Sequence, residues 1–139
     1  MNPLKSISLN LILFISLLWL CNCTFTQSYT PQFNDKLTAV LDTIKTSYGF
    51  ENITFIAKKR SGTGGQNCTL TVKFINGKNI PTDVDKTTDL AKQLGSKIKT
   101  IVKNPKEFNN YIILFSTIKT DGNTTNENYT GHEFKQGEL

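Results

Sequence analysis

The 139-residue chain has few of the residues on which small exported domains and metalloproteins often depend. It contains three cysteines, Cys21, Cys23 and Cys68, and at most two would remain after removal of an export signal, which argues against a disulfide framework. Cys68 alternates with apolar residues and is predicted to be buried. With His132 as the single histidine, a structural zinc site is not expected. The sequence therefore predicts a domain that folds without disulfide, metal or cofactor.

Catalytic motifs are also scarce. There is no Gly-x-Ser-x-Gly elbow, and His132-Glu133 lacks the second histidine of a zinc-protease helix. We therefore expect a protein that is not an enzyme. Two alternatives stay open. One is a small secreted hydrolase or transferase in which His132 meets Glu133 or Cys68 in a pocket; the other is a toxin-like or immunity-like secreted protein.

The chain has only a mild excess of positive charge. Sixteen basic and eleven acidic residues give a formal net charge of +5. This excess favours anionic surfaces such as lipid headgroups, but it is far from the pattern of a nucleic-acid-binding protein. We expect no nucleic-acid partner.

One long apolar stretch stands out, at residues 7–20. Its 14 residues follow Lys5 and match the hydrophobic region of a signal peptide. A membrane-spanning helix needs ~20 such residues, and no comparable stretch follows, so the mature chain is predicted not to span a membrane. We interpret residues 1–22 as a signal peptide.

The end of this segment is informative. Leu20-Cys21-Asn22-Cys23 resembles a relaxed lipobox, the site at which bacterial lipoproteins are lipidated on a cysteine and cut just before it. Leu20 holds the apolar position three residues before Cys23, although Asn22 replaces the usual small residue. Cleavage after Cys23 by an ordinary signal peptidase is the alternative, which would leave a periplasmic or secreted protein.

The chain as a whole resembles small lipoproteins of Bacteroidota: a short signal that ends in cysteine, a polar spacer, and a compact domain rich in Lys, Asn and Thr. The resemblance implies a location at the cell membrane or outer membrane through a lipid on Cys23. Residues 23–29 would then form the lipid-bearing cysteine and a short tether. The implied function is a non-enzymatic binding or accessory domain of the cell envelope, with an unknown envelope protein or an anionic ligand as partner.

Residues 30–139 read as one domain. Helical spacing from Thr30-Pro31 to Gly49 predicts a first helix, and residues 84–102 predict a second, with Gly95 marking a close approach to another element. Strands are predicted over residues 53–57, 68–74, 111–118 and 128–134. This αββαββ order predicts an α+β fold, with an antiparallel four-stranded sheet and both helices on one face.

A polar, glycine-rich connection spans residues 58–67 between the first two strands. Its glycines would let backbone N–H groups approach an anion, and its cations would supply charge. An exposed flexible hairpin is the alternative interpretation. The candidate anion-binding or partner-contact residues are Lys58, Lys59, Arg60, Gly62, Gly64 and Gly65. Lysines on the second helix are expected to be solubilising or to contact an anionic membrane.

Overall fold

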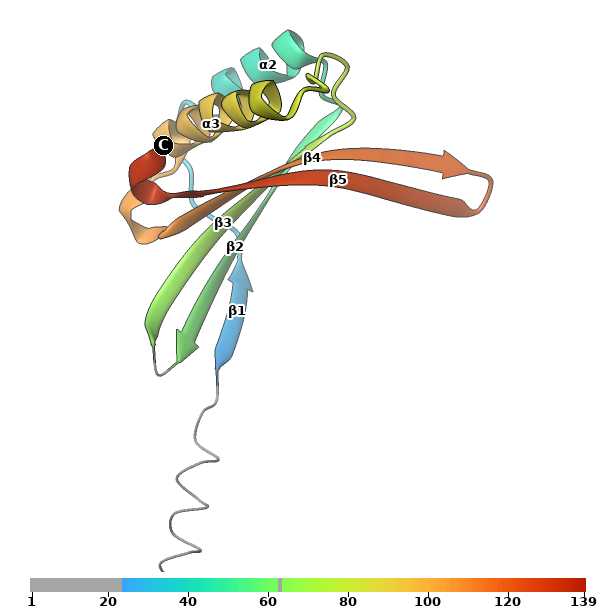
Figure 1. Cartoon of the computed structure of the whole chain (residues 1–139). Helices are drawn as coiled ribbons and strands as arrows, with labels where there is room; N and C mark the ends of the chain where they lie inside the picture. Colours follow the sequence, from blue (N-terminus) through green and yellow to red (C-terminus); the bar gives the residue numbers. More distant parts are fainter. Residues whose placement is uncertain (1–23, 63) are drawn as a thin grey trace, which may run out of the picture.

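A computed structural model describes residues 24–62 and 64–139. The predicted signal peptide and Cys23 lie outside the described residues. The described residues form two α-helices and five strands (Figure 1). In chain order the elements are β1 (Phe25–Tyr29), α2 (Leu37–Tyr48), β2 (Asn52–Gly62), β3 (Gly65–Ile75), α3 (Val84–Ile101), β4 (Asn110–Asp121) and β5 (Thr124–Lys135), with short 3-10 turns at Pro105–Glu107 and Gln136–Glu138.

The strands form one mixed sheet in the order β1-β2-β3-β4-β5. β3 and β4 are parallel, and every other neighbouring pair is antiparallel. The α+β class is confirmed, but the prediction of four antiparallel strands is wrong on two counts: β1 adds a fifth strand, and β4 runs parallel to β3. The physical reason for the second is the length of α3. Eighteen residues span ~27 Å, which returns the chain to the starting end of β3 before β4 begins.

Both helices cover the same face of the sheet, as predicted (Figure 1). Alternate side chains of β3 and β4 point towards the helices because successive residues of a strand face opposite sides. Apolar residues of α3 complete this core. The fully buried members include Ile44, Ala57, Leu70, Val72, Phe74, Ala91, Leu94, Ile98, Ile101, Tyr111 and Ile113.

The helix boundaries show which local signals were decisive. Gly49 adopts a left-handed conformation with φ 66° and ends α2, as predicted. Asp83 caps α3, since its side chain accepts a hydrogen bond from the Lys86 N–H at 3.0 Å. The first helix begins later than predicted, at Leu37, because Phe33 pairs with Val102 in an isolated antiparallel bridge instead.

Gly95 confirms the expected close approach to another element. A Cβ at this position would lie 3.0 Å from Leu139 and 3.5 Å from Ile113. One turn later, the Lys99 ammonium donates to the backbone carbonyls of Gln136 and Leu139, at 2.6 and 2.8 Å. The second half of α3 therefore holds the C-terminal residues against the sheet.

Because β3 and β4 pair over only part of their length, each end of the sheet continues as a hairpin that the other half does not border. β3 pairs with β4 only over residues 69–75 and 110–116. At one end, residues 25–27, 59–62 and 65–68 continue beyond this region. Together with the adjoining Thr24, Ser28, Tyr29 and Lys58, we call them the basal overhang. At the other end, residues 117–121 pair with residues 124–128 alone, and we call this ribbon the distal arm. The two run in different directions, downward and to the right in Figure 1.

Side-chain hydrogen bonds fix the base of the distal arm. Asn76, at φ 53°, accepts from the Ile118 N–H at 2.7 Å and donates to Glu51 at 2.6 Å. Its own N–H donates to the Ser116 carbonyl at 2.8 Å. Asn76 thus extends the contact between β3 and β4 past the end of the regular ladder.

Candidate functional site

The predicted polar connection at residues 58–67 is not a loop. β2 continues to Gly62 and β3 begins at Gly65, so the strands pair almost to the tip of the hairpin. The prediction that residues 58–67 lie outside the strands is wrong because β1 pairs with β2 on its other side and keeps this part of the sheet three strands wide. Backbone groups that were expected to be free for an anion are instead used in strand pairing.

The three cations of this hairpin lie on both faces of the sheet. Lys58 and Arg60 project from the face opposite the helices, whereas Lys59 lies on the face that carries the core. They therefore do not converge on one small anion. The glycines gather near the tip, in a groove of about 270 Å³ that Arg60 also lines. Its described lining residues are Thr24, Arg60, Gly62, Gly64, Gly65 and Asn67.

The expected tether at residues 24–29 is also different in the structure. Phe25 lies opposite Ser61, and the pairing continues to Tyr29 opposite Ala57. A Cβ on Gly62 would lie 3.4 Å from the Thr24 hydroxyl. The described chain therefore begins beside the tip of the basal overhang and enters the domain as an edge strand. The local sequence gives little signal for this strand, since Phe25 and Tyr29 share a face but the polar Gln27 lies between them.

His132, Glu133 and Cys68 do not meet. His132 faces the helices, and its Nδ1 lies 3.3 Å from the Thr88 hydroxyl, whereas Glu133 points to the opposite face. Cys68 shares the face of His132 but lies ~13 Å away along the strands and two strands across. The buried Nε2 of His132 has no hydrogen-bond partner among the described residues. The geometry that the hydrolase alternative requires is not present at these three side chains.

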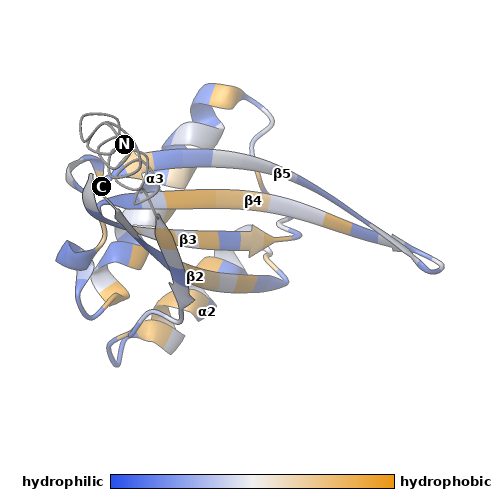
Figure 2. Ribbon diagram, turned by 90° about the horizontal axis from the view of Figure 1, so that it is seen from below, coloured by the Kyte–Doolittle hydropathy of each residue, from blue (hydrophilic) through white to orange (hydrophobic). Residues whose placement is uncertain are grey.

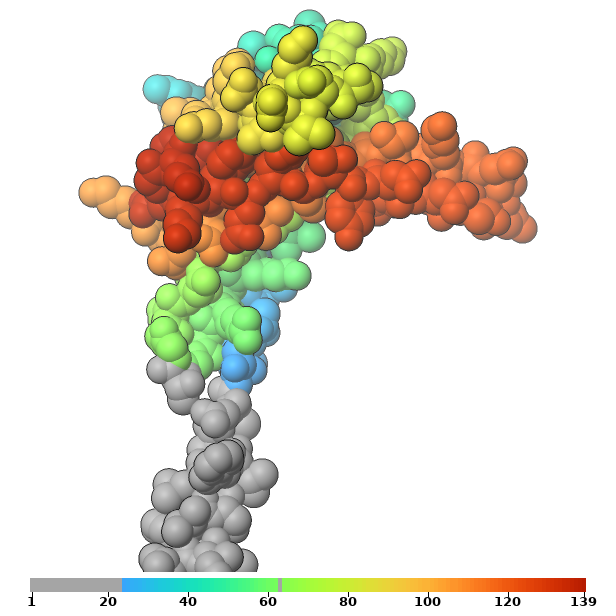
Figure 3. Space-filling model, viewed as in Figure 1, coloured from blue at the N-terminus to red at the C-terminus, as the bar shows by residue number. Residues whose placement is uncertain are grey.

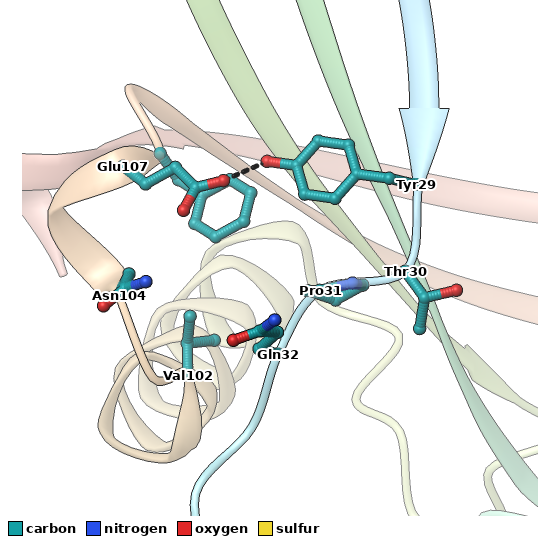
Figure 4. A pocket seen from close by; sticks show the side chains of 8 residues that line it. Tyr29, Thr30, Pro31, Gln32, Val102, Asn104 and Glu107 are labelled. Carbon is teal, nitrogen blue, oxygen red and sulfur yellow. Dashed lines mark hydrogen bonds between the residues drawn. The ribbon is translucent and has the colours of Figure 1, made fainter.

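A polar pocket that the sequence did not reveal lies where β1 meets the segment after α3. Its volume is about 200 Å³, and Tyr29 and Glu107 lie on its wall (Figure 4). The Tyr29 hydroxyl donates a hydrogen bond to the Glu107 carboxylate. These two residues are 78 positions apart, so no local pattern could have paired them.

Tyr29 and Glu107 also line a second, wider groove of about 520 Å³ together with Lys59 and Cys68. Burial raises the pKa of the Tyr29 hydroxyl, and the hydrogen bond to Glu107 raises it further. The hydroxyl is therefore protonated at neutral pH and acts as a donor. Cys68 was predicted to be buried, and this is confirmed, with 7% of its surface exposed.

The face of the sheet opposite the helices carries apolar side chains that no described element covers. Ile56 is 45% exposed and Tyr129 is 69% exposed, while Ile112 and Leu114 are half-buried between them. Figure 2 shows apolar residues in β2, β3 and β4, whose alternate side chains point to the core and to this uncovered face. Exposed apolar surface of this kind is typical of a contact site for another molecule.

Neither a metal-binding cluster nor a membrane-spanning helix occurs in the described part of the chain. Residues 24–62 and 64–139 contain no group of three or more potential metal ligands. Within the same residues, no helix combines the length and hydropathy needed to cross a membrane. Comparison with known proteins adds no assignment: no family model, no curated protein and no solved structure matches this chain.

Proposed function

We propose that this protein is an exported, lipid-anchored and non-enzymatic binding or accessory domain of the bacterial cell envelope. The lipobox-like sequence at Cys23 supports the anchor. The observation that carries the binding role is the uncovered apolar face of the sheet, since one-sided sheets in small domains are normally polar on the exposed side. Because the described chain begins at the basal overhang, a lipid just before Thr24 would leave this face free.

The anchor is tested by the intact mass of the mature protein from membrane and soluble fractions of its host. The expected result is a chain that begins at Cys23, carries acyl groups and sediments with membranes. Cys23→Ser should abolish the acylated, membrane-bound form of the mature protein. An unmodified chain that begins at or after Thr24 in the soluble fraction would overturn the anchor.

The binding role is tested by crosslinking the native protein in host envelopes and identifying the attached partner. Ile56→Lys with Tyr129→Lys places two charges on the uncovered face at exposed positions, so we expect loss of the crosslink without loss of folding. Val84→Lys is the matched control, because Val84 is 73% exposed but lies on α3, on the other side of the sheet. Equal crosslinking by all three proteins would exclude this face as the contact surface.

A further inference from the structure

The point at which the chain enters the domain is set by β1. Its first residue, Phe25, pairs with Ser61 beside the hairpin tip, and Thr24 lies against Gly62. Twenty-three residues precede Thr24 and include the apolar segment 7–20. An anchor in this segment or on Cys23 therefore reaches the domain at the basal overhang, with no long tether between them.

The basal overhang carries charge of one sign. Residues 24–29, 58–62 and 65–68 contain Lys58, Lys59 and Arg60 and no acidic residue. In the described part of the chain none of these three cations takes part in a salt bridge. Glu107 lines the same groove as Lys59, but it is hydrogen-bonded to Tyr29. An anionic surface would thus meet cations on both faces of the overhang.

An exposed aromatic ring lies at the same end. Phe25 is 65% exposed and projects on the face of Lys59, while Lys58 and Arg60 lie on the other face. Lysine and arginine are attracted to anionic headgroups, and an apolar ring beside them can insert at the boundary between headgroups and acyl chains. Figure 3 shows this end of the molecule as a narrow projection below the helices.

We propose that the basal overhang docks end-on against anionic lipid headgroups, with Lys58, Lys59 and Arg60 among the phosphates and Phe25 at the interface. This inference rests on the proposed lipid anchor, which brings the overhang to the membrane. Docking of this kind makes the sheet stand away from the membrane. The base of the distal arm then lies about 36 Å from the hairpin tip along β3, from eleven residues at ~3.3 Å each. The uncovered face remains accessible to an envelope partner.

Hydrogen exchange of the lipidated mature protein tests this orientation on two kinds of vesicle, phosphatidylcholine alone and phosphatidylcholine mixed with phosphatidylglycerol. Each cation near an anionic leaflet favours the docked state by about fivefold. We therefore expect the amides of residues 64–66 to exchange at least about tenfold more slowly on the mixed vesicles. Residues 119–128 of the distal arm should exchange equally on both, and added salt should remove the difference.

Charge-reversal variants distinguish an effect of the overhang cations from an effect of the protein's net charge. Lys58→Glu with Arg60→Glu should lower docking by about 25-fold or more. Lys92→Glu with Lys97→Glu makes the same change in net charge on exposed positions of α3, away from the overhang, and should preserve docking. If the first variant unfolds, Lys58→Gln with Arg60→Gln removes the charges without reversing them and should show a smaller loss.

The outcomes distinguish docking from anchoring. A lipidated, membrane-bound protein whose residues 64–66 exchange equally on both vesicles would overturn docking and leave the anchor standing. Equal loss of protection in the overhang and helix variants would also overturn it. A protein recovered soluble and unmodified at its N-terminus would overturn both proposals, since nothing would then hold the overhang at a membrane.

Discussion

The basal overhang and the distal arm are both hairpin ends that continue beyond the shared part of the sheet, yet they are stabilised differently. The basal overhang is three strands wide, carries the buried Cys68 side chain and is closed by the hydrogen bond from Tyr29 to Glu107. The distal arm has two strands, and all its residues except the half-buried Ile118 are exposed. A third strand lets one end share the core, whereas the other depends on polar contacts at its base.

Their charges differ as well. The basal overhang contains three cations and no acid, while residues 117–121 and 124–128 of the arm contain Lys119, Asp121 and Glu127. An anionic membrane therefore attracts one end selectively. A hairpin that projects from the sheet is therefore not a contact surface for that reason alone. The two hairpins differ in the number of strands that support them and in the sign of their charge.

The largest effect is expected at the base of the distal arm. Asn76→Ala removes the side-chain hydrogen bonds to Ile118 and Glu51. It also puts alanine at φ 53°, a left-handed conformation that asparagine tolerates better than alanine. We expect unfolding free energy to fall by about 1–3 kcal/mol, with faster hydrogen exchange in the arm. Chemical denaturation and exchange measure both. An unchanged exchange rate in the arm would show that something other than Asn76 supports it.

A smaller effect is expected where the basal overhang meets the domain. Tyr29→Phe keeps the ring but removes the hydrogen bond to Glu107. We expect a loss of about 0.5–1.5 kcal/mol in denaturant unfolding, because the Glu107 carboxylate can regain water. The matched control is Tyr111→Phe, which removes a hydroxyl that donates to the Pro105 carbonyl at 3.0 Å. If Tyr29→Phe is neutral, β1 is held by strand pairing alone.

The contacts of Glu127 make the arm sensitive to pH. Hydrogen bonds from Lys73, at 2.8 Å, and from Ser116 lower the pKa of the Glu127 carboxyl. A carboxyl whose pKa is lower in the folded state stabilises the fold above its ordinary pKa and loses this contribution as pH falls through the lowered value. Glu127→Gln should therefore differ most from the parent protein near neutral pH and converge with it in acid. A constant difference across the pH range would contradict this assignment.

The smallest effect is expected from shortening the distal arm. Replacing residues 119–126 by a two-residue turn removes exposed side chains and strand pairs that no third strand covers. We expect the thermal unfolding free energy to change by less than about 0.5 kcal/mol. A large loss would show that the arm contributes to the core, and the contrast between the two overhangs would have to be abandoned.

Much of the local structure was predictable because its signals are local. The alternation of Leu70, Val72 and Phe74 marked a strand with one buried face, and Gly49 marked the end of a helix. Val84, the first residue of α3, shows the limit of such patterns, because it fits the apolar spacing of the helix and yet is 73% exposed. The basic hairpin was recognised as a candidate site, but its residues were assigned to a loop. Pairing with β1 on one side and β3 on the other depends on partners that are distant in the sequence.

By itself, the sequence determined the α+β class, the segments of the core, the end of α2 at Gly49 and the basic character of one hairpin. All of these depend on residues within a few positions of one another. Only the tertiary structure decided that β4 runs parallel to β3, that β1 is an edge strand, that Tyr29 meets Glu107, and that His132 and Cys68 remain apart. These features depend on how distant segments share one sheet, because strand order and register are set by packing between elements and not by local pattern.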